Sequence, residues 1–267
     1  MYKIYNEDCL ETMKNHIDEK SIDIILTSPP YNITDRNKVG NIDYSMKNKQ
    51  GMYIDYKDYK SVEEYSDFIT ERFLLFDRIL KENGVILYNV SYGTNTFTSM
   101  NSLYYSLYNI IVKTPFNLFD KIIWKKKCAL PNNVSPNKLT RICEDIFVIA
   151  RKDEKDSFIM NKEISCVGKN GQKFYKPLYN YIEAENNDES CSLNNATYSS
   201  DLCCKLLNLY GKEGMTVYDP FLGTGTTLVA TEKLKMNGIG SEISAKQCEY
   251  AEKRLSNIVN DDISELF

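Results

Sequence analysis

The stretch TSPPYN, residues 27–32, combines hydrogen-bond acceptors with a flat ring directly after an apolar run. The run, residues 22–26, is typical of a buried strand, and the prolines must end it because proline cannot donate to a sheet ladder. The Ser28 hydroxyl and the Pro29 carbonyl are acceptors, and the rigid backbone fixes the direction of that carbonyl. Tyr31 is expected to hold its ring at the mouth of the site. This set fits a planar ligand that carries an amino group.

A second stretch, VYDPFLGTGTTLVA at residues 217–230, has the order strand, glycine-rich turn, helix. Gly223 and Gly225 let the backbone approach a ligand, and a helix N-terminus favours an anionic group. The stretch lacks the third glycine of a dinucleotide fingerprint and the Gly-Lys-Ser/Thr of a phosphate loop. Glu242 ends the following strand, where ribose hydroxyls are usually bound. The turn alone is equally typical of a tight strand–helix junction, but with Glu242 it predicts half a site for an adenosine-containing cofactor.

Strands alternate with helices along most of the chain, and these elements must position both stretches. Strands are expected at residues 3–5, 22–26, 85–90, 121–126, 145–152, 215–219 and 237–243, and helices at 10–16, 61–83, 96–108, 228–235 and 245–258. Ser61 and Glu64 have capping-box spacing at the start of the second helix, and Gly84 is expected to close it. The alternation predicts an α/β fold with a doubly wound, mostly parallel sheet. Such sheets bind ligands at the carboxyl ends of their strands, where both stretches lie.

The 267 residues are expected to form a single domain, 1–267, with two polar excursions at residues 33–60 and 153–200. The first excursion is expected to be a mobile loop near the active site. Hydrophobic residues make up 42% of the chain, which is ample for a core, and no apolar run is long enough to cross a membrane. The first ten residues lack the apolar segment of a secretory signal, which predicts a cytoplasmic protein.

The eight cysteines are scattered without a C-x-x-C pair, and His16 is the one histidine. Metal sites usually need closely spaced ligands, so no metal site is expected. Free thiols in a reducing cytoplasm account better for the cysteines.

Charge is uneven along the chain. The net charge of −4 does not suggest a nucleic-acid partner, yet residues 121–152 hold eight basic side chains. Only Glu144 and Asp145 oppose them within that stretch, which gives a local net charge of +6. A solvated face is the default interpretation, and a phosphate-contacting face is the alternative.

TSPPYN resembles the catalytic motif of S-adenosylmethionine-dependent DNA amino-methyltransferases, and DPFLGTGTT, residues 219–227, resembles their cofactor motif. The catalytic motif comes first, as in the circularly permuted beta group of that family. The segments NEDCLETM, LTRICEDIFVIARK and GSEISAKQCEYAEKRL resemble further parts of it. The resemblance implies a Rossmann-like methyltransferase fold that binds S-adenosylmethionine, releases S-adenosylhomocysteine and uses no metal.

The resemblance also assigns roles to residues. Ser28 and the Pro29 carbonyl would accept the hydrogens of the target amine, and Tyr31 would stack on a base flipped out of duplex DNA. The catalytic residues implied are Ser28, Pro29, Pro30 and Tyr31. The cofactor contacts implied are Asp8, Thr27, Asp219, Phe221, Gly223, Gly225, Thr226 and Glu242. The DNA contacts expected on the basic stretch are Lys125, Lys126 and Arg141.

One departure from the family concerns the segment before the cofactor strand. Asn195-Ala196 stands where the family often has His-Pro, so the resemblance leaves open which residues contact the amino-acid end of the cofactor, with Ser199 and Ser200 as candidates. The resemblance implies that residues 153–195 would form the target-recognition region. The resemblance leaves open a homodimer and a cognate restriction endonuclease as partners besides duplex DNA.

The target base is the finest distinction that the motif offers. Within the family that the chain resembles, a serine before Pro-Pro-Tyr is associated slightly more often with N4 of cytosine than with N6 of adenine. The remaining alternatives are an RNA or small-molecule N-methyltransferase and a catalytically silent DNA-binding module.

Overall fold

The computed structural model describes residues 1–32, 60–90, 97–129, 131, 133, 136, 139–154, 157, 158, 160–188, 193, 194 and 197–264. Apart from Lys60, the expected mobile loop 33–60 lies outside these residues. The elements in chain order are β1 (Tyr2–Tyr5), α1 (Cys9–Asn15), β2 (Ile22–Thr27), α2 (Val62–Ile79), β3 (Leu80–Val90), α3 (Phe97–Lys113), β4 (Phe116–Lys126), β5 (Cys143–Arg151), β6 (Ile164–Val167), β7 (Lys173–Tyr175), β8 (Tyr181–Ala184), α4 (Ser200–Tyr210), β9 (Thr216–Asp219), α5 (Thr226–Lys233), β10 (Asn237–Ser241) and α6 (Ala245–Ser264).

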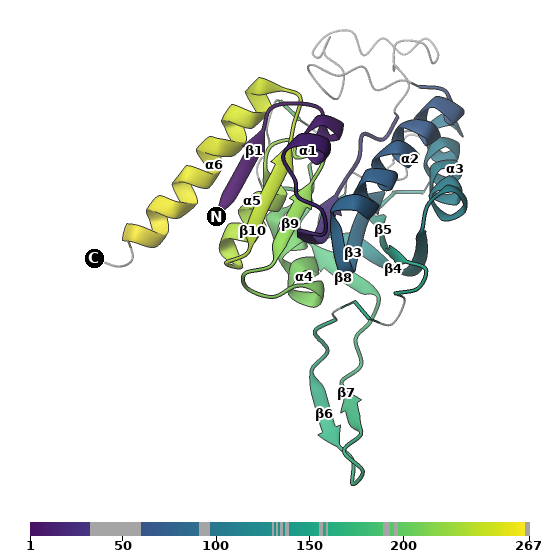
Figure 1. Ribbon diagram of the computed structural model, residues 1–267, viewed down its shortest axis with the longest axis vertical. Coiled ribbons are helices and arrows are strands. Elements are labelled where there is room, and N and C mark those ends of the chain that lie inside the picture. Colours follow the sequence, from purple (N-terminus) through teal and green to yellow (C-terminus); the bar gives the residue numbers. More distant parts are fainter. Residues whose placement is uncertain are drawn as a thin grey trace.

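An eight-stranded sheet forms the centre of the molecule, with strand order β1-β10-β9-β2-β3-β5-β4-β8 (Figure 1). The first five strands run parallel, and β5 runs antiparallel to both β3 and β4. Strand β8 extends the sheet parallel to β4. The predicted doubly wound, mostly parallel sheet is confirmed. The carboxyl ends of β1, β2, β9 and β10 therefore share one edge.

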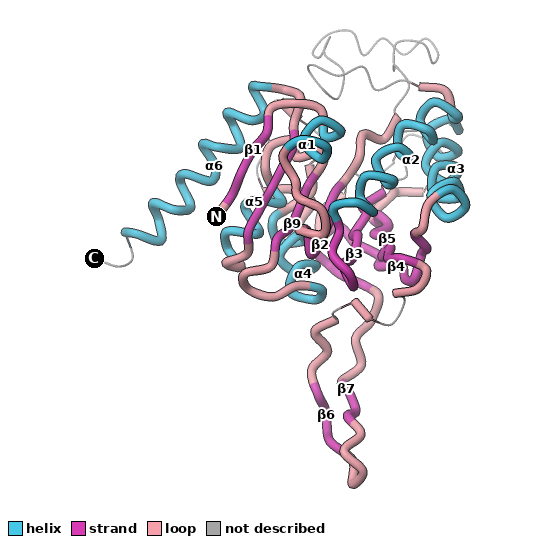
Figure 2. The backbone as a smooth tube through the Cα atoms, viewed as in Figure 1, coloured by secondary structure: helices cyan, strands magenta, loops and turns pink. Residues whose placement is uncertain are grey.

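Helices cover both faces of the sheet (Figure 2). One core cluster joins α1, α2 and α3 to the sheet, and a second joins α4 and α5 to the other face. Helix α6 packs on α5 in a third, smaller cluster. Each large apolar side chain buried in these layers stabilises the fold by roughly 1.5–3 kcal/mol. Within the described residues, no helix has the length and apolar character needed to cross a membrane.

Helix α2 begins as predicted but ends earlier. Ser61 and Glu64 form the capping box, and the helix stops at Ile79 rather than at Gly84. Leu80 is already extended and pairs with Ile22 of β2, so sheet pairing ends the helix before the glycine signal. Gly84 lies inside β3, where an added Cβ would lie 2.6 Å from Leu80 Cγ.

The second polar excursion is more ordered than its weak periodicity suggested. It contains β6, β7 and β8, and α4 begins at its last residue. Among the described residues, β6 and β7 pair only with each other, and they project from the sheet as a hairpin (Figure 1).

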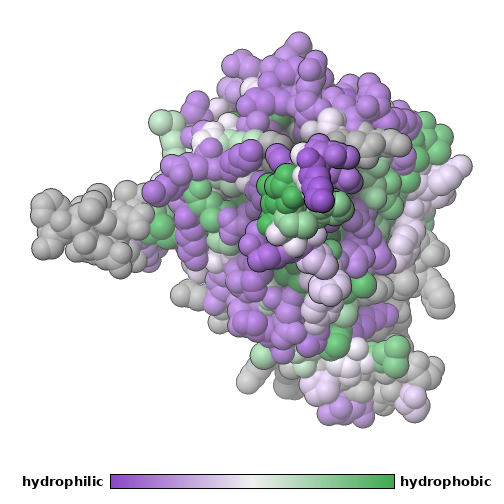
Figure 3. Space-filling view, turned by 90° about the horizontal axis from the view of Figure 1, so that it is seen from below, coloured by the Kyte–Doolittle hydropathy of each residue, from purple (hydrophilic) through white to green (hydrophobic). Residues whose placement is uncertain are grey.

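This hairpin leaves from the edge opposite the carboxyl ends. Arg151, at the end of β5, donates to the Leu80 carbonyl at the start of β3, at 2.7 Å. Asn161 then donates to the Gly211 carbonyl ahead of β9, at 2.6 Å. Figure 3 views this side, where hydrophobic and hydrophilic side chains lie next to each other. Val167 and Tyr175 of the hairpin are 61% and 50% exposed.

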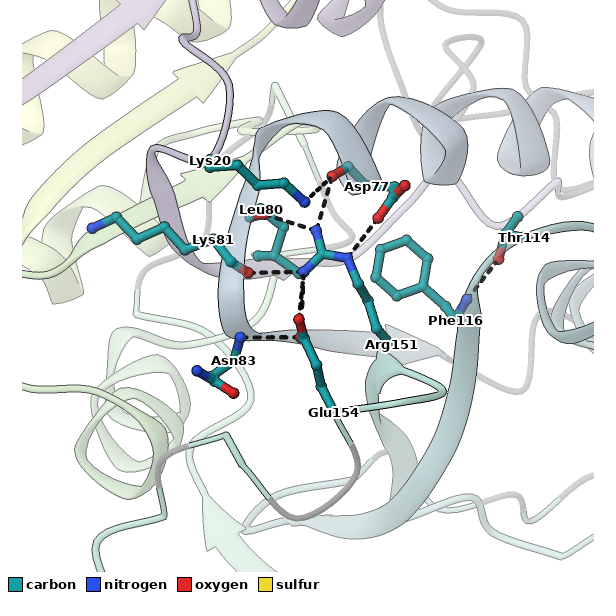
Figure 4. A network of polar contacts seen from close by, with 9 residues as sticks. All are labelled: Lys20, Asp77, Leu80, Lys81, Asn83, Thr114, Phe116, Arg151 and Glu154. Carbon is teal, nitrogen blue, oxygen red and sulfur yellow. Dashed lines mark hydrogen bonds and ion pairs between the residues drawn. The ribbon is translucent and has the colours of Figure 1, made fainter.

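The side chain of Arg151 joins three elements at the same edge (Figure 4). Its guanidinium donates to the carbonyls of Asp77, Leu80 and Lys81 and contacts the carboxylates of Asp77 and Glu154. It thereby satisfies carbonyls at the end of α2 that have no helical partner.

Candidate active site

A pocket lies at the carboxyl ends of the central strands, on the side away from the hairpin. Its walls come from the segments after β1, β2, β9 and β10, from α2 and from Asn194, Thr197 and Tyr198. The predicted site residues that line it are Asp8, Ser28, Pro30, Phe221, Gly223, Thr226 and Glu242. The fold therefore brings the catalytic stretch and the glycine turn into one cavity.

Two predicted cofactor contacts, Thr27 and Asp219, are buried outside the lining. Thr27 donates its hydroxyl to Asp219 at 2.8 Å, which ties the catalytic stretch to the glycine turn. Asp219 also accepts from the Phe221 amide at 3.1 Å, Thr227 Oγ1 at 2.5 Å and the Tyr198 hydroxyl at 3.1 Å. Burial raises the pKa of Asp219, while these donors oppose the rise. Both residues hold the two halves of the pocket together.

The glycine turn needs its glycines for different reasons. Both have left-handed backbones, with φ of 56° at Gly223 and 85° at Gly225. Gly223 lines the pocket, where the lack of a side chain leaves room for a ligand. Gly225 lies outside the lining, and an added Cβ would lie 2.7 Å from Ala251 Cβ of α6. Gly225 therefore serves the packing of two helices.

Glu242 is fixed at the pocket by the turn that it faces. Its carboxylate accepts from the Gly223 and Ser244 amides, each at 2.9 Å. Burial raises the pKa of Glu242 above its ordinary value. Gln247, which the sequence reasoning missed, donates to the same carboxylate at 3.4 Å and accepts from Asn194 at 3.1 Å.

Asp8 has a buried arginine partner that was also missed. Asp8 caps α1 through the Leu10 amide at 2.8 Å, and Arg72 Nη2 lies 3.2 Å from its Oδ2. The Arg72 guanidinium stacks 3.5 Å from the centre of the Phe68 ring and is only 4% exposed. The side chains of Arg72 and Phe68 both line the pocket. A charged residue at a helical position shared with the buried Tyr65, Ile69 and Phe76 was the available signal.

Tyr31 lies inside the protein, so its predicted placement at the mouth is wrong. Its side chain is 6% exposed and belongs to the core under α2 and α3. Its hydroxyl lies 2.5 Å from Ser28 Oγ and 3.2 Å from Asn89 Oδ1. The apolar ring is buried while the hydroxyl keeps polar partners, which is the usual arrangement for a buried tyrosine.

The two prolines also differ. The Pro30 carbonyl accepts from the Tyr65 hydroxyl at 2.8 Å. Pro29 is buried and outside the lining, and among the described residues no donor is bonded to its carbonyl. Asn32, the next polar residue, donates to the Lys60 carbonyl at 2.9 Å and accepts from its amide at 2.7 Å.

The basic stretch is opposed more strongly than its sequence indicated. Lys121 and Lys126 pair with Asp145 and Glu144. Lys125 and Lys127 pair with Glu183 and Glu185, at 2.9 and 2.7 Å. Glu183 lies in β8 and Glu185 follows that strand. Acidic residues from another segment therefore reduce the net charge of +6 that was expected for the basic stretch. Arg141 is exposed, and Lys138 lies outside the described residues.

The residues through which the segment before β9 lines the pocket differ from those expected. Asn195-Ala196 lies outside the described residues, but Asn194, Thr197 and Tyr198 line the pocket. The candidates Ser199 and Ser200 lie outside the lining. Ser199 caps α4 through the Leu202 amide, and Ser200 donates to Asp188. In the described part of the chain, no three His, Cys, Asp or Glu side chains converge as metal ligands.

Comparison with known proteins gives consistent matches. A family model described as DNA methylase, for N6 and N4 methyltransferases, matches residues 22–253. The type II methyltransferase M.HinfI of Haemophilus influenzae is 26% identical over 261 residues, covering 96% of this chain and 68% of its own. The PvuII DNA methyltransferase (cytosine-N4-specific) superposes with a TM-score of 0.67 at 17% identity, covering 94% and 85%. The M1.HpyAVI–SAM complex gives 0.60 at 20% identity, covering 96% and 100%.

Proposed function

This chain belongs to the DNA methylase family of N6 and N4 methyltransferases, which are S-adenosylmethionine-dependent, and we propose that it methylates an exocyclic amine of a base flipped out of duplex DNA. One observation carries the proposal. Ser28 and the glycine turn open into the same pocket, and the Thr27–Asp219 hydrogen bond joins the two stretches at 2.8 Å. The methyl donor and the amine would then be held by one rigid unit.

The lining fits S-adenosylmethionine by its chemistry. Glu242 offers carboxylate oxygens for ribose hydroxyls, and Phe68 and Phe221 offer aromatic surface for an adenine. Gly223 presents bare backbone, and Asn194 and Thr197 are polar groups for the amino-acid end. Three acids, Glu7, Asp8 and Glu242, face one base, Arg72, which suits a cationic ligand. When bound, this group supplies an electrophilic methyl on a sulfonium.

The chain's own residues prepare the amine. Its lone pair is delocalised into the ring of the base, so it is a poor nucleophile. Ser28 Oγ, in the pocket lining, would accept one of its hydrogens and favour a pyramidal nitrogen, whose lone pair then points at the methyl. The Pro29 carbonyl, buried outside the lining, would accept the second hydrogen only after a local rearrangement. The nitrogen–carbon bond forms as the sulfur–carbon bond breaks. The methylated amine then loses one proton to water.

Cytosine N4 is the proposed target, with adenine N6 as the alternative. The proposal rests on Ser28 at the head of the Pro-Pro-Tyr motif. Stacking of the base on Tyr31 would require a change in the residues that cover its ring, since that ring is buried.

DNA is proposed to contact Lys125, Lys126 and Arg141, and residues 153–195 to contain the target-recognition region. Ser28 follows β2 at the carboxyl-end edge of the sheet. Lys125 lies towards the same edge, because Ile123 of β4 pairs with Asp145, and Asp145 in turn pairs with the end of β3. The β6–β7 hairpin lies at the other edge, so the part of 153–195 nearest the pocket is β8 and the residues after it. A homodimer and a cognate restriction endonuclease stay predictions.

The test is transfer of a labelled methyl group from S-adenosylmethionine to duplex DNA, RNA and free nucleosides. Duplex DNA is expected to be the acceptor. Digestion and mass spectrometry of the nucleosides then distinguish N4-methylcytosine from N6-methyladenine. Retained binding of S-adenosylmethionine with no transfer to DNA would refute the proposal and would favour the alternative of a catalytically silent DNA-binding module.

A further inference from the structure

Three polar side chains form a chain that starts at the pocket and ends in the core. Ser28 lines the pocket, and its Oγ lies 2.5 Å from the Tyr31 hydroxyl oxygen. That oxygen lies 3.2 Å from Asn89 Oδ1. The amide nitrogen of Asn89 in turn donates to the Asp145 carbonyl at 3.4 Å. Tyr31 and Asn89 are both buried, with 6% and 1% of their surfaces exposed.

The direction of the hydrogen bonds in this chain follows from the donors and acceptors available. The Asp145 carbonyl can only accept, so the amide nitrogen of Asn89 must face it and the amide oxygen must face Tyr31. An amide oxygen can also only accept, so Tyr31 donates its one proton to Asn89. The Tyr31 oxygen then accepts the hydroxyl proton of Ser28.

We propose that Tyr31 and Asn89 are positioning residues that make Ser28 a pure acceptor towards the substrate amine. This inference rests on the proposed role of Ser28. With its proton committed to Tyr31, Ser28 Oγ presents only lone pairs to the pocket. A hydroxyl that already donates is also a stronger acceptor, because hydrogen bonds in a chain polarise one another.

The chain orients Ser28 but does not remove a proton from the amine. An amide oxygen is not a base at neutral pH, so a proton passed along from Ser28 would find no acceptor at Asn89. The proton of the methylated amine therefore goes to water, as in the mechanism above. A free Ser28 hydroxyl, in contrast, would turn its own proton towards the amine lone pair in part of the molecules and compete with the methyl group.

A double-mutant cycle tests the inference on the full-length protein, with duplex DNA as substrate. Tyr31→Phe removes the acceptor of the Ser28 proton and is expected to lower kcat roughly tenfold, the worth of about one hydrogen bond. The dissociation constant for S-adenosylmethionine is expected to stay unchanged. In a Ser28→Ala background, adding Tyr31→Phe is expected to cause no further loss, because its effect passes through Ser28. Tyr210→Phe, at a tyrosine on α4 outside the pocket lining, controls for the general effect of removing a tyrosine hydroxyl.

Two substitutions of Asn89 separate polarity from packing. Asn89→Asp keeps an acceptor for the Tyr31 proton, and Asn89→Leu does not, while both lose the bond to Asp145. The aspartate variant is expected to keep several-fold more activity than the leucine variant, with thermal unfolding measured for both.

The outcomes separate the two levels of the argument. Equal activity of the two Asn89 variants would overturn the inference, because the acceptor for the Tyr31 proton would then have no effect. Additive losses in the cycle would also overturn it and would show that Tyr31 acts independently of Ser28. Full activity of Ser28→Ala would instead refute the proposed role of Ser28 itself.

Discussion

At the scale of single residues, the two carboxylates of the pocket are held in opposite ways. Asp8 pairs with the buried Arg72, whereas Glu242 accepts backbone amides and has no basic partner within 4.0 Å among the described residues. Burial therefore raises the pKa of Glu242. Its protonated form persists to a higher pH than that of an ordinary glutamate.

Glu242→Gln is expected to weaken S-adenosylmethionine binding by roughly 10- to 100-fold, because hydrogen bonds to a charged acceptor are worth about 1.5–3 kcal/mol. In the wild type, affinity should fall as the pH is lowered through the raised pKa, where the carboxylate gains a proton. The glutamine variant should lack this fall. Isothermal titration between pH 4.5 and 8 measures both effects. Glu249→Gln, on the exposed side of α6, is the control, and an identical pH profile for both variants would contradict the assignment.

At the scale of elements, the sheet edge opposite the pocket is stabilised by one arginine. Arg151 is 8% exposed in its side chain and bonds to carbonyls at the end of α2 and the start of β3. It thus fixes where α2 ends and where β3, the strand that contains Asn89, begins.

Arg151→Met is expected to lower the free energy of unfolding by about 3 kcal/mol, because it leaves several buried carbonyls and a carboxylate without their donor. Urea denaturation measures the change. Lys152→Met is the matched control, since Lys152 makes one such bond, to the Thr114 carbonyl. Equal losses for the two variants would show that the network contributes little.

The β6–β7 hairpin offers a second test at this scale. The Lys176 amide donates to the Glu163 carbonyl at 2.8 Å, so residues 164–175 can be replaced by a two-glycine turn without moving the ends apart. If the hairpin is part of the recognition region, the preference for cognate over non-cognate DNA should fall at least tenfold while S-adenosylmethionine binding is unchanged. Gln172→Ala is the control. Unchanged preference would place recognition in β8 and the residues after it.

At the scale of the whole molecule, segments distant in the sequence set how buried each of the cations proposed to contact DNA is. Lys126 is bonded to the buried Glu144 at 2.5 Å and lies over the Trp124 ring, so part of its charge is used within the fold. Arg141 is exposed in the segment that leads into β5. The two residues were predicted alike from the sequence but have different surroundings.

Arg141→Gln is therefore expected to weaken DNA binding uniformly across sequences and to reduce the salt slope of the affinity by about one. Lys126→Gln is expected to lower stability by about 1–3 kcal/mol, because it leaves the Glu144 carboxylate without its partner. Fluorescence anisotropy at several salt concentrations and thermal unfolding measure the two effects. Lower stability in Arg141→Gln together with weaker DNA binding in Lys126→Gln would reverse the roles given to these residues.

The sequence by itself determined the features that depend on neighbours in the chain. The alternation of apolar runs gave the parallel α/β sheet, Ser61 and Glu64 gave the start of α2, and the two quoted stretches gave both halves of the pocket. Ser28, Gly223 and Glu242 were found because a proline elbow, a glycine turn and a strand end are local signals.

The tertiary structure decided what depends on partners distant in the sequence. Asn89 meets Tyr31 from 58 residues away, Arg72 meets Asp8 from 64, and Asp219 meets Thr27 from 192. No local pattern encodes these pairs, since each is formed only when the sheet and the helices packed on it bring distant segments together. For the same reason the charge of the basic stretch was overestimated until β8 supplied Glu183, and the ring of Tyr31 was placed at the surface until α2 and α3 covered it.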